Sequence, residues 1–531
     1  MHYRFLARVI GFPLGIHIFV LAGVLQAADR KPNVVLILID DFGYECVTAN
    51  GGESYQTPVM DRLAATGVRF EQVHVQPMCT PTRVALMTGI NNKRNYTHFA
   101  HLDFSQKTFG NLFRDAGYAT CITGKWQLQG DYEGPGHFGF DEYALWQLNR
   151  RPDRYKNPGL EINGQPHDYT KNEYGPDLVS DYALDFIHRK KDAPFFLYYP
   201  MMLTHKPYDA TPDSPDYAAS ITGKNQEPSG HFPDMVAYTD KLIGKLIAKL
   251  EELHLRDNTL VIILGDNGTA GRTPSRFQGR LVLGGKGTSL MWGTHVPGIG
   301  NWPGHVASGK VCSDIIDVTD FLPTLCEAAG VRVPDELKID GRSFLPQLHG
   351  QNGNPREGRY AWYNPVGGVT AKFEFAHDQN YKLYADGKFY NFAKDDLEKS
   401  PLADTALNAP AKAAKEKLTA LLKSHEGPRD GYFSKQSGTF SGEQGEDADG
   451  NQMPKPAKKM VVKPAASEVA KANPLVARFN ERDLNHDGKL DLDEFTATVS
   501  HKDGAKARFE KLDSNKDGCI TREEFMIGAK N

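Results

Sequence analysis

The chain has 531 residues, which exceeds the size of a single compact core and leaves room for two or three domains. With 40% hydrophobic and 24% charged residues, its composition is globular and excludes wholesale disorder, collagen and a continuous coiled coil. The 62 basic and 66 acidic side chains leave a net charge of −4, so no global basic field attracts nucleic acid, and six cysteines are too few for a disulfide-built scaffold.

The first 27 residues have the pattern of a secretory signal peptide. Two arginines precede a mostly apolar stretch, Val9–Leu25, and Ala27 and Ala28 offer small side chains for cleavage. The alternative is a membrane-anchoring helix, but glycine and proline interrupt the apolar stretch, which is short for a membrane span. We therefore expect a secreted or periplasmic protein with no stable membrane span.

Residues 28–355 alternate between strand and helix patterns, which predicts an α/β domain with a large, mostly parallel sheet and helices on both faces. The run NVVLILI is typical of a strand that is covered on both sides. Strands are expected over Asn33–Ile39, Val68–Val75, Tyr118–Thr123, Pro194–Pro200 and Thr259–Leu264. Helices are expected over Pro58–Thr66, Lys107–Ala116, Asp177–Lys190 and Asp234–Leu253.

The pattern changes after residue 355. Short aromatic-rich runs between Arg356 and Phe392 predict a small antiparallel sheet, and a helix is expected near Ala411–Ser424, so that residues 356–433 form a C-terminal subdomain. Residues 434–473 have few large apolar side chains and the composition of a flexible linker. A separate helical module is expected over residues 474–531.

This last module contains a repeat with a spacing of 30 residues, and each copy carries D-x-N-x-D-G followed by Glu at loop position 12. Oxygen ligands at positions 1, 3, 5, 7, 9 and 12 suit Ca²⁺, and the pair resembles an EF-hand domain more than a dockerin-like module. Leu490 and Ile520 occupy position 8, where paired loops are expected to bridge by a short strand contact. The expected ligands are Asp483, Asn485, Asp487, the Lys489 carbonyl, Asp491 and Glu494 in the first loop, and Asp513, Asn515, Asp517, the Cys519 carbonyl, Thr521 and Glu524 in the second.

Polar side chains follow two of the predicted buried strands. Asp40 and Asp41 end the first strand, and Asp266 and Asn267 end another. Ligands of open α/β sheets bind outside the carboxyl ends of the strands, and three carboxylates that meet there repel one another unless a cation lies between them. All-oxygen donors favour Ca²⁺ or Mg²⁺ over zinc.

The sharpest motif is Cys79-Thr80-Pro81-Thr82-Arg83, where a buried thiol would be the ordinary interpretation of the cysteine. Together with Gly124-Lys125-Trp126, Thr204-His205-Lys206-Pro207, Asp266-Asn267-Gly268 and Gly285-Lys286-Gly287, it resembles the type I sulfatases of the alkaline phosphatase superfamily. The resemblance covers about residues 32–402 and extends to the aromatic runs of the C-terminal subdomain.

The resemblance implies that a formylglycine-generating enzyme oxidises Cys79 to formylglycine, whose hydrate attacks the sulfur of a sulfate ester. It further implies that Asp40, Asp41, Asp266 and Asn267, together with the modified Cys79, hold Ca²⁺, with Mg²⁺ as the alternative. Arg83 would bind the formylglycine hydroxyl, Lys125 and Lys286 the sulfate oxygens, and His205 the leaving oxygen. A lone lysine is otherwise usually a solvated surface group.

One position departs from the family pattern. Gln127 stands where the family usually has histidine, and glutamine cannot accept a proton at neutral pH. His98, His101 or His137 could take over that role, and the sequence does not choose among them.

A substrate pocket is harder to locate. Aromatic and guanidinium groups suit sugar faces and anions, but the same residues are ordinary in surface loops. The candidates are Trp146, Arg150, Arg151, Arg154 and Tyr155, and Arg272, Arg276 and Arg280. Among the remaining cysteines, Cys312 and Cys326 are a possible disulfide pair.

The leading hypothesis is therefore a sulfatase that removes sulfate from a sulfated carbohydrate. A phosphonate monoester or phosphodiester hydrolase of the same superfamily is the alternative enzyme, because related members share the Cys-x-Pro-x-Arg nucleophile. A non-catalytic protein that binds sulfated glycans, having lost turnover with Gln127, is the third hypothesis, and the other charged residues of the motif argue against it.

Overall fold

A ten-stranded sheet forms the centre of the larger of two units into which the chain divides. The computed structural model describes residues 30–220, 230–271, 273–364 and 372–427, and in the tail residues 482, 489–492, 495–496, 505–513, 516–521 and 524–525. The predicted signal peptide, the predicted linker at 434–473 and Arg272 lie outside the described residues.

The strand order in this sheet is β12-β2-β11-β8-β1-β7-β3-β4-β5-β6. The five central strands β8, β1, β7, β3 and β4 run parallel to one another, whereas β11 is antiparallel to both β2 and β8, and β5 and β6 form an antiparallel edge beside β4. The strands are β1 Asn33–Ile39, β2 Val68–His74, β3 Ala119–Lys125, β4 Glu142–Trp146, β5 Gly159–Ile162, β6 Gln165–Asp168, β7 Phe195–Pro200, β8 Thr259–Gly265, β11 His295–Asn301 and β12 Lys310–Asp317.

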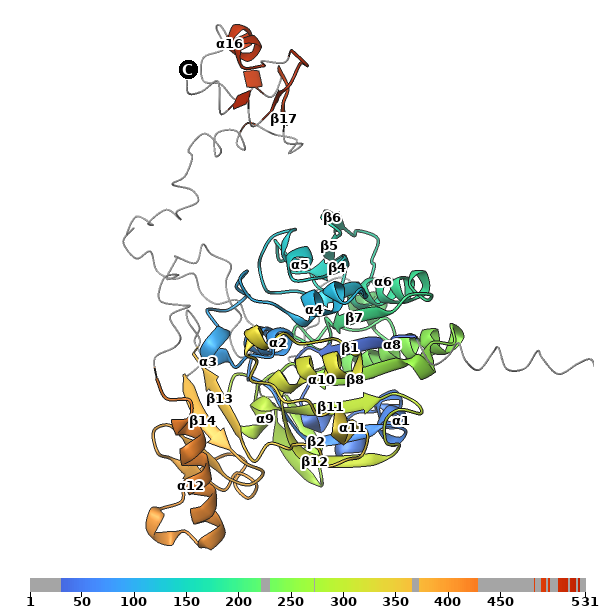
Figure 1. Ribbon diagram of the computed structural model, residues 1–531. Helices are drawn as coiled ribbons and strands as arrows, with labels where there is room; N and C mark the ends of the chain where they lie inside the picture. Colours follow the sequence, from blue (N-terminus) through green and yellow to red (C-terminus); the bar gives the residue numbers. More distant parts are fainter. Residues whose placement is uncertain are drawn as a thin grey trace, which may run out of the picture. The chain divides into compact units, whose positions relative to one another are not determined.

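Helices cover both faces of the sheet, as predicted (Figure 1). Alternate residues of β1 explain the two layers, because Val34, Leu36 and Leu38 pack into the core on one face and Val35, Ile37 and Ile39 into the core on the other. The first core contains side chains of α2 Cys79–Thr88, α4 Phe109–Asp115 and α10 Phe321–Ala328. The second contains side chains of α1 Pro58–Ala65, α6 Gly175–Arg189 and α8 Phe232–Glu252.

Short elements complete the connections between these layers. They are α3 Asn92–Asn95, α5 Gly134–His137, α7 Tyr217–Ser220, α9 Met291–Thr294, α11 Leu345–Leu348 and the hairpin of β9 Pro274–Phe277 and β10 Arg280–Leu283.

The predicted C-terminal sheet is present as four antiparallel strands in the order β13-β14-β15-β16. The strands are β13 Arg359–Tyr363, β14 Phe373–His377, β15 Lys382–Tyr384 and β16 Phe389–Tyr390, and α12 Ala409–Lys423 follows them. Ala376, Leu383 and Phe389 pack against Leu418 of α12, so the sheet and helix share a small core of their own.

A buried histidine stack joins this sheet to the main sheet. His74 of β2 lies between His295 of β11 and His377 of β14, with ring centroids 5.0 and 4.4 Å apart. Burial lowers the pKa of His295 to about 4 and that of His377 to about 3, so both rings are neutral at neutral pH.

The described residues of the tail form a second unit, which contains α16 Ala505–Leu512. Leu490 of β17 Lys489–Leu490 pairs with Ile520 of β18 Ile520–Thr521, which confirms the predicted strand contact at loop position 8. Both side chains are buried with three phenylalanines, Phe495, Phe509 and Phe525.

The suggested Cys312–Cys326 disulfide is wrong. Both residues carry free thiols and are buried, Cys312 on β12 and Cys326 on α10.

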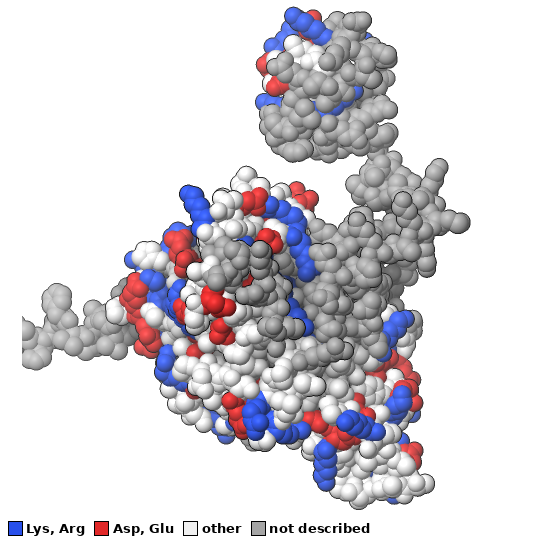
Figure 2. Space-filling model, turned by 180° about the vertical axis from the view of Figure 1, so that it is seen from behind, with Lys and Arg blue, Asp and Glu red and all other residues white. Residues whose placement is uncertain are grey.

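On the face shown in Figure 2, basic and acidic side chains are interspersed, consistent with the nearly balanced composition. Within the described part of the chain, no helix has both the length and the apolar character needed to cross a bilayer.

Candidate active site

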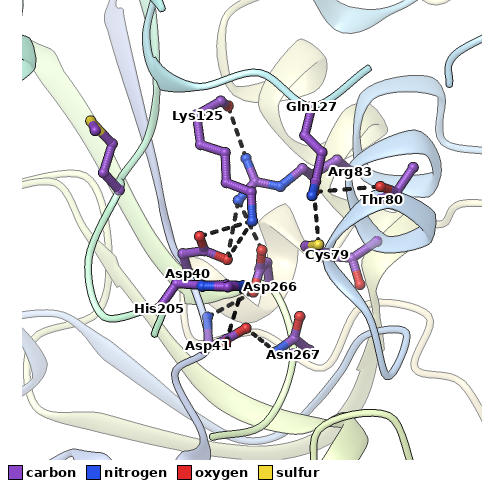
Figure 3. Close-up of polar contacts among 12 residues, drawn as sticks. Asp40, Asp41, Cys79, Thr80, Arg83, Lys125, Gln127, His205, Asp266 and Asn267 are labelled. Atoms are coloured by element: carbon purple, nitrogen blue, oxygen red, sulfur yellow. Dashed lines mark hydrogen bonds and ion pairs between the residues drawn. The ribbon is translucent and has the colours of Figure 1, made fainter. Parts of the chain in front are cut away.

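The predicted acidic residues meet at the carboxyl ends of β1 and β8 (Figure 3). The two strands pair in parallel up to Ile39 and Gly265, so the residues that follow them start side by side. The backbone N–H of Asp41 donates a hydrogen bond to Asp266 Oδ1 at 3.0 Å, and Asn267 Nδ2 donates to Asp41 Oδ1 at 2.8 Å. All four predicted ligand residues are therefore fully buried in one cluster.

The chemistry of this cluster fits a hard cation. The side-chain oxygen Asn267 Oδ1 is buried and has no hydrogen-bond partner, while Nδ2 of the same amide contacts the Asp41 carboxylate. Burial and the nearby charge of Asp40 raise the pKa of Asp266, which is the response of carboxylates that crowd together. A divalent cation would relieve that repulsion and use the amide oxygen. Possible ligand atoms of Asp40, Asp41 and His205 also lie within 4.8 Å of one another, although His205 was not predicted as a ligand.

A close backbone contact after Asn267 helps to assemble the site. The N–H of Gly268 donates to the carbonyl of Gly293, and a Cβ at Gly268 would lie 1.8 Å from the carbonyl oxygen of Trp292. Only glycine allows this approach, which holds the segment that follows Lys286 against the end of β8.

Cys79 occupies the first position of α2, and its side chain is fully buried. Its thiol donates a hydrogen bond to Gln127 Oε1 at 2.8 Å. Arg83 lies four residues later and hence on the same side of the helix. Figure 3 shows Cys79 beside the group that contains Arg83 and Lys125, so the predicted nucleophile lies among the predicted cations.

Four buried cations surround the three carboxylates. Arg83 pairs with Asp266 Oδ2 at 2.8 Å. Lys125 Nζ lies 3.0 and 2.9 Å from the two oxygens of Asp40. Lys286 Nζ lies 2.8 Å from Asp41 Oδ2.

Arg154 is the fourth cation, and its Nη1 lies 3.0 Å from Asp40 Oδ2. The sequence marked Arg154 only as one of several arginines in a loop, whereas the structure places it inside the charge cluster, 4.1 Å above the ring of Trp146. No motif carried this information. With Arg154 included, the buried set has one positive charge in excess, which favours an anionic substrate.

These contacts control the protonation of the cluster. Burial alone would raise the pKa of Asp40, but the charges of Lys125 and Arg154 hold it well below its usual range. Burial opposes the charged form of Lys286, yet the Asp41 carboxylate raises its pKa. Burial lowers the pKa of Lys125, and Asp40 opposes that effect.

His205 faces the same carboxylates from the segment after β7. Its Nε2 lies 3.8 Å from Asp41 Oδ2, and its Nδ1 lies 2.6 Å from the carbonyl oxygen of Lys206. Burial and the charge of Lys286 hold the pKa of His205 well below its usual range. The hydroxyl of Tyr155 donates to the carbonyl of His205. Tyr155, which the sequence suggested as a substrate-pocket residue, therefore holds the backbone of His205 in place.

The three alternative histidines lie in two places. His137 Nε2 contacts the carbonyl of Phe104, and its ring stacks on the Phe104 ring. His98 and His101 stack on each other with ring centroids 4.5 Å apart. Their loop is tied to the site, because the Ala100 N–H donates to the hydroxyl of Thr80, next to Cys79.

The other pocket candidates make ion pairs elsewhere. Arg150 pairs with Glu161 and Asp168. Arg276 and Arg280 of the β9–β10 hairpin pair with Glu53 and Asp396. Arg151 is half-buried.

The described residues of the second tail loop form a turn around acidic oxygens. Asp513 accepts hydrogen bonds from the backbone N–H groups of Asp517 and Gly518, at 3.2 and 3.0 Å. The Thr521 hydroxyl donates to Glu524 Oε2 at 2.8 Å. Of the predicted ligands, Lys489, Asp491, Asp513, Asp517, Cys519, Thr521 and Glu524 are described, and Asp483, Asn485, Asp487, Glu494 and Asn515 lie outside the described residues.

Three family profiles match consecutive parts of the chain. The profile described as Sulfatase matches residues 32–331, and the one described as N-sulphoglucosamine sulphohydrolase, C-terminal, matches residues 290–424. The EF hand profile matches residues 475–500 and 505–527.

Individual relatives agree with these profiles. N-acetylgalactosamine-6-sulfatase of Homo sapiens is 32% identical over 357 residues, which span 61% of this chain and 67% of that protein. Arylsulfatase A of Homo sapiens is 31% identical over 408 residues, or 68% of this chain and 76% of that protein. The crystal structure of Ps i-CgsB in complex with k-i-k-neocarrahexaose superposes with a TM-score of 0.63 at 25% identity, covering 75% of this chain and 94% of that one.

Proposed function

The chain belongs to the sulfatase family, with an EF-hand region at its C-terminal end, and is an enzyme that hydrolyses sulfate esters; we propose that its substrates are sulfated carbohydrates. The family assignment confirms the resemblance seen in the sequence. The observation that carries the proposed chemistry is the buried set of four cations and three carboxylates around Cys79.

Sulfatases imply a metal site and a formylglycine, and we assign them to the acidic cluster and to Cys79. Once formed, the formylglycine hydrate would supply a hydroxyl nucleophile for the ester sulfur, and a Ca²⁺ ion held by the acidic cluster would supply positive charge that polarises it. Asp40, Asp41, Asp266 and Asn267 provide the oxygen ligands for this ion.

The cations of the chain then bind the sulfate group. An ammonium group has three N–H donors, and Lys286 uses one of them on Asp41. Its remaining donors, with one from Lys125, can bind sulfate oxygens in a site from which water is excluded, where charge–charge interactions are strong. Arg83 holds Asp266 and lies beside Cys79, so it positions both the nucleophile and a metal ligand.

His205 and Lys286 lie on the same side of Asp41 and are the groups available to the leaving oxygen. We assign both to that oxygen. The Lys286 ammonium donates to the developing alkoxide as the S–O bond breaks and supplies the positive charge, and His205 can donate there only when it is protonated, because the single N–H of its neutral ring faces the carbonyl of Lys206.

Two comparisons support a carbohydrate substrate. The names of the N-acetylgalactosamine-6-sulfatase relative and of the Ps i-CgsB complex both refer to sugars.

A sulfate-release screen over defined sulfated saccharides and a simple aryl sulfate tests this proposal. We expect at least one sulfated saccharide to be hydrolysed with a higher kcat/KM than the aryl sulfate, and mass spectrometry of the active enzyme to find an aldehyde or its hydrate at Cys79. Cys79→Ala is the matched control and should fold without activity. Hydrolysis of the aryl sulfate with no saccharide turned over would contradict the carbohydrate proposal, and full activity with an unmodified thiol would contradict the assigned nucleophile.

We further propose that the two tail loops bind Ca²⁺ and that the protein is exported. The turn of acidic oxygens around Asp513 supports the first of these proposals, and the N-terminal sequence pattern supports the second.

A further inference from the structure

A groove of about 820 Å³ lies between the segment that follows Lys286 and the C-terminal sheet. Gly287, Thr288, Ser289 and Leu290 form one wall, and residues of β13–β16 form the other. Gly287 directly follows Lys286, and its N–H donates to the carbonyl of Pro77, two residues before Cys79, at 2.9 Å. The groove therefore starts at a segment that also builds the active site, and its volume is in the range of small-ligand sites.

A row of aromatic rings crosses the groove wall. The ring centroids of Tyr363 and Phe373, Phe373 and Phe375, and Phe375 and Tyr384 are each 5.5 Å apart, and Tyr390 lies 5.9 Å beyond Tyr384. All of these except Phe375 line the groove, and Phe373 and Tyr384 are half-buried, so part of each ring is accessible. Flat aromatic surfaces of this kind pack against the C–H face of a pyranose ring.

The wall is held rigidly against the segment that follows Lys286. The Tyr384 hydroxyl lies 2.8 Å from Ser289 Oγ, and Lys382 Nζ donates to the carbonyl of Ser289 at 2.7 Å. A ligand in the groove therefore contacts a surface whose position relative to Lys286 is set by direct hydrogen bonds.

The charges of the groove differ from those of the active site. Among the described lining residues there are three carboxylates, Glu374, Asp386 and Glu398, and two lysines, and none is an arginine. Each carboxylate is already paired with a lysine, Glu374 with Lys93, Asp386 with Lys388 and Glu398 with Lys382. The groove therefore has no cluster of cations like the one around Cys79 that could bind a second sulfate, whereas the hydroxyl groups of a neutral sugar can form hydrogen bonds with its paired polar groups.

We propose that this groove binds an unsulfated sugar unit that adjoins the sulfated unit in the substrate. The inference rests on the proposed carbohydrate function and adds that the enzyme recognises at least two units, one anionic at the buried cations and one neutral on the aromatic wall.

The test compares a sulfated monosaccharide with a disaccharide that carries the same sulfated unit and an unsulfated neighbour. Phe373→Leu keeps apolar volume but removes the flat ring, so kcat/KM for the disaccharide should fall about five- to tenfold while the monosaccharide value stays within about twofold. Phe373→Tyr should retain the wild-type preference. The matched control is Tyr132→Leu, which removes an exposed aromatic ring outside the groove and should change neither value.

The outcomes separate the two proposals. If the disaccharide is hydrolysed and Phe373→Leu lowers both substrates equally or neither, the groove does not bind the second unit. If no saccharide is hydrolysed although the aryl sulfate is, the carbohydrate function itself fails. The wild-type enzyme offers a test that needs no variant: a disaccharide sulfated on both units should have at least about a fivefold lower kcat/KM than the one with a neutral neighbour, and equal values would overturn the inference.

Discussion

Replacing Arg154 by methionine tests whether the buried cations bind the anionic substrate as a set. The guanidinium donates from Nη1 to Asp40 Oδ2 at 3.0 Å and to the carbonyl of Met202 at 3.3 Å, and it lies 4.1 Å above the Trp146 ring. Methionine retains an unbranched apolar side chain over that ring but removes the charge. The cluster loses one positive charge, while Asp40 keeps Lys125 at 2.9 Å.

The remaining partner limits the size of the effect. A buried carboxylate that loses its only cation costs about 3–5 kcal/mol. Asp40 stays paired, so the loss should be closer to that of a single charged hydrogen bond, about 1.5–3 kcal/mol. If this loss falls on binding of the sulfate ester in the transition state, kcat/KM decreases roughly ten- to a hundredfold.

Steady-state kinetics on an aryl sulfate measure this loss, and Arg332→Met is the matched control. Its replacement changes the net charge equally, but Arg332 is exposed and pairs with Asp335, which is also exposed. We expect Arg332→Met to keep kcat/KM within about twofold, because an exposed charge is screened by solvent. Equal losses in the two variants, or no loss in Arg154→Met, would show that Arg154 is not part of the substrate-binding set.

Three further predictions concern the histidine stack, the unusual glutamine and the tail. Burial lowers the pKa of His295 to about 4, from about 6.5 in the unfolded chain, so the unfolded state binds more protons and the stability should fall as the pH decreases through this interval. His295→Gln should reduce the pH dependence of the unfolding temperature, and an unchanged slope would contradict this. Because Gln127 cannot accept a proton, pre-steady-state kinetics should show a burst of released alcohol ahead of sulfate, and Gln127→His should speed the slow phase. If the native enzyme shows no burst, another group accepts the proton when sulfate is released. A chain that ends at residue 434 should fold and hydrolyse an aryl sulfate, whereas the isolated tail should gain helical circular dichroism with Ca²⁺; an unfolded truncation product would mean that the tail contributes to the catalytic core.

Local motifs carried most of the candidate site. Asp40 and Asp41 follow a run that can only be a buried strand, and Asp266 follows another, so the rule that strand ends meet at one edge was enough to bring them together. The helix that begins at Cys79 was not predicted, because CTPTRVALMT contains proline and three threonines. Since every residue of this helix is buried, its sequence also lacks the alternation of apolar and polar residues that identifies a surface helix.

The sequence by itself determined the strands and helices that have a clear hydrophobic pattern, the acidic strand ends, the cysteine motif and the two calcium-type loops, because each depends on residues close together along the chain. Only the tertiary structure decided which distant side chains complete them. Arg154, 114 residues from Asp40, reaches that carboxylate because the chain returns from β4 over the ends of the central strands. The histidine stack and the aromatic groove depend in the same way on how the C-terminal sheet packs beside β2 and α9, since burial and pairing of charges arise from contacts that no local pattern encodes.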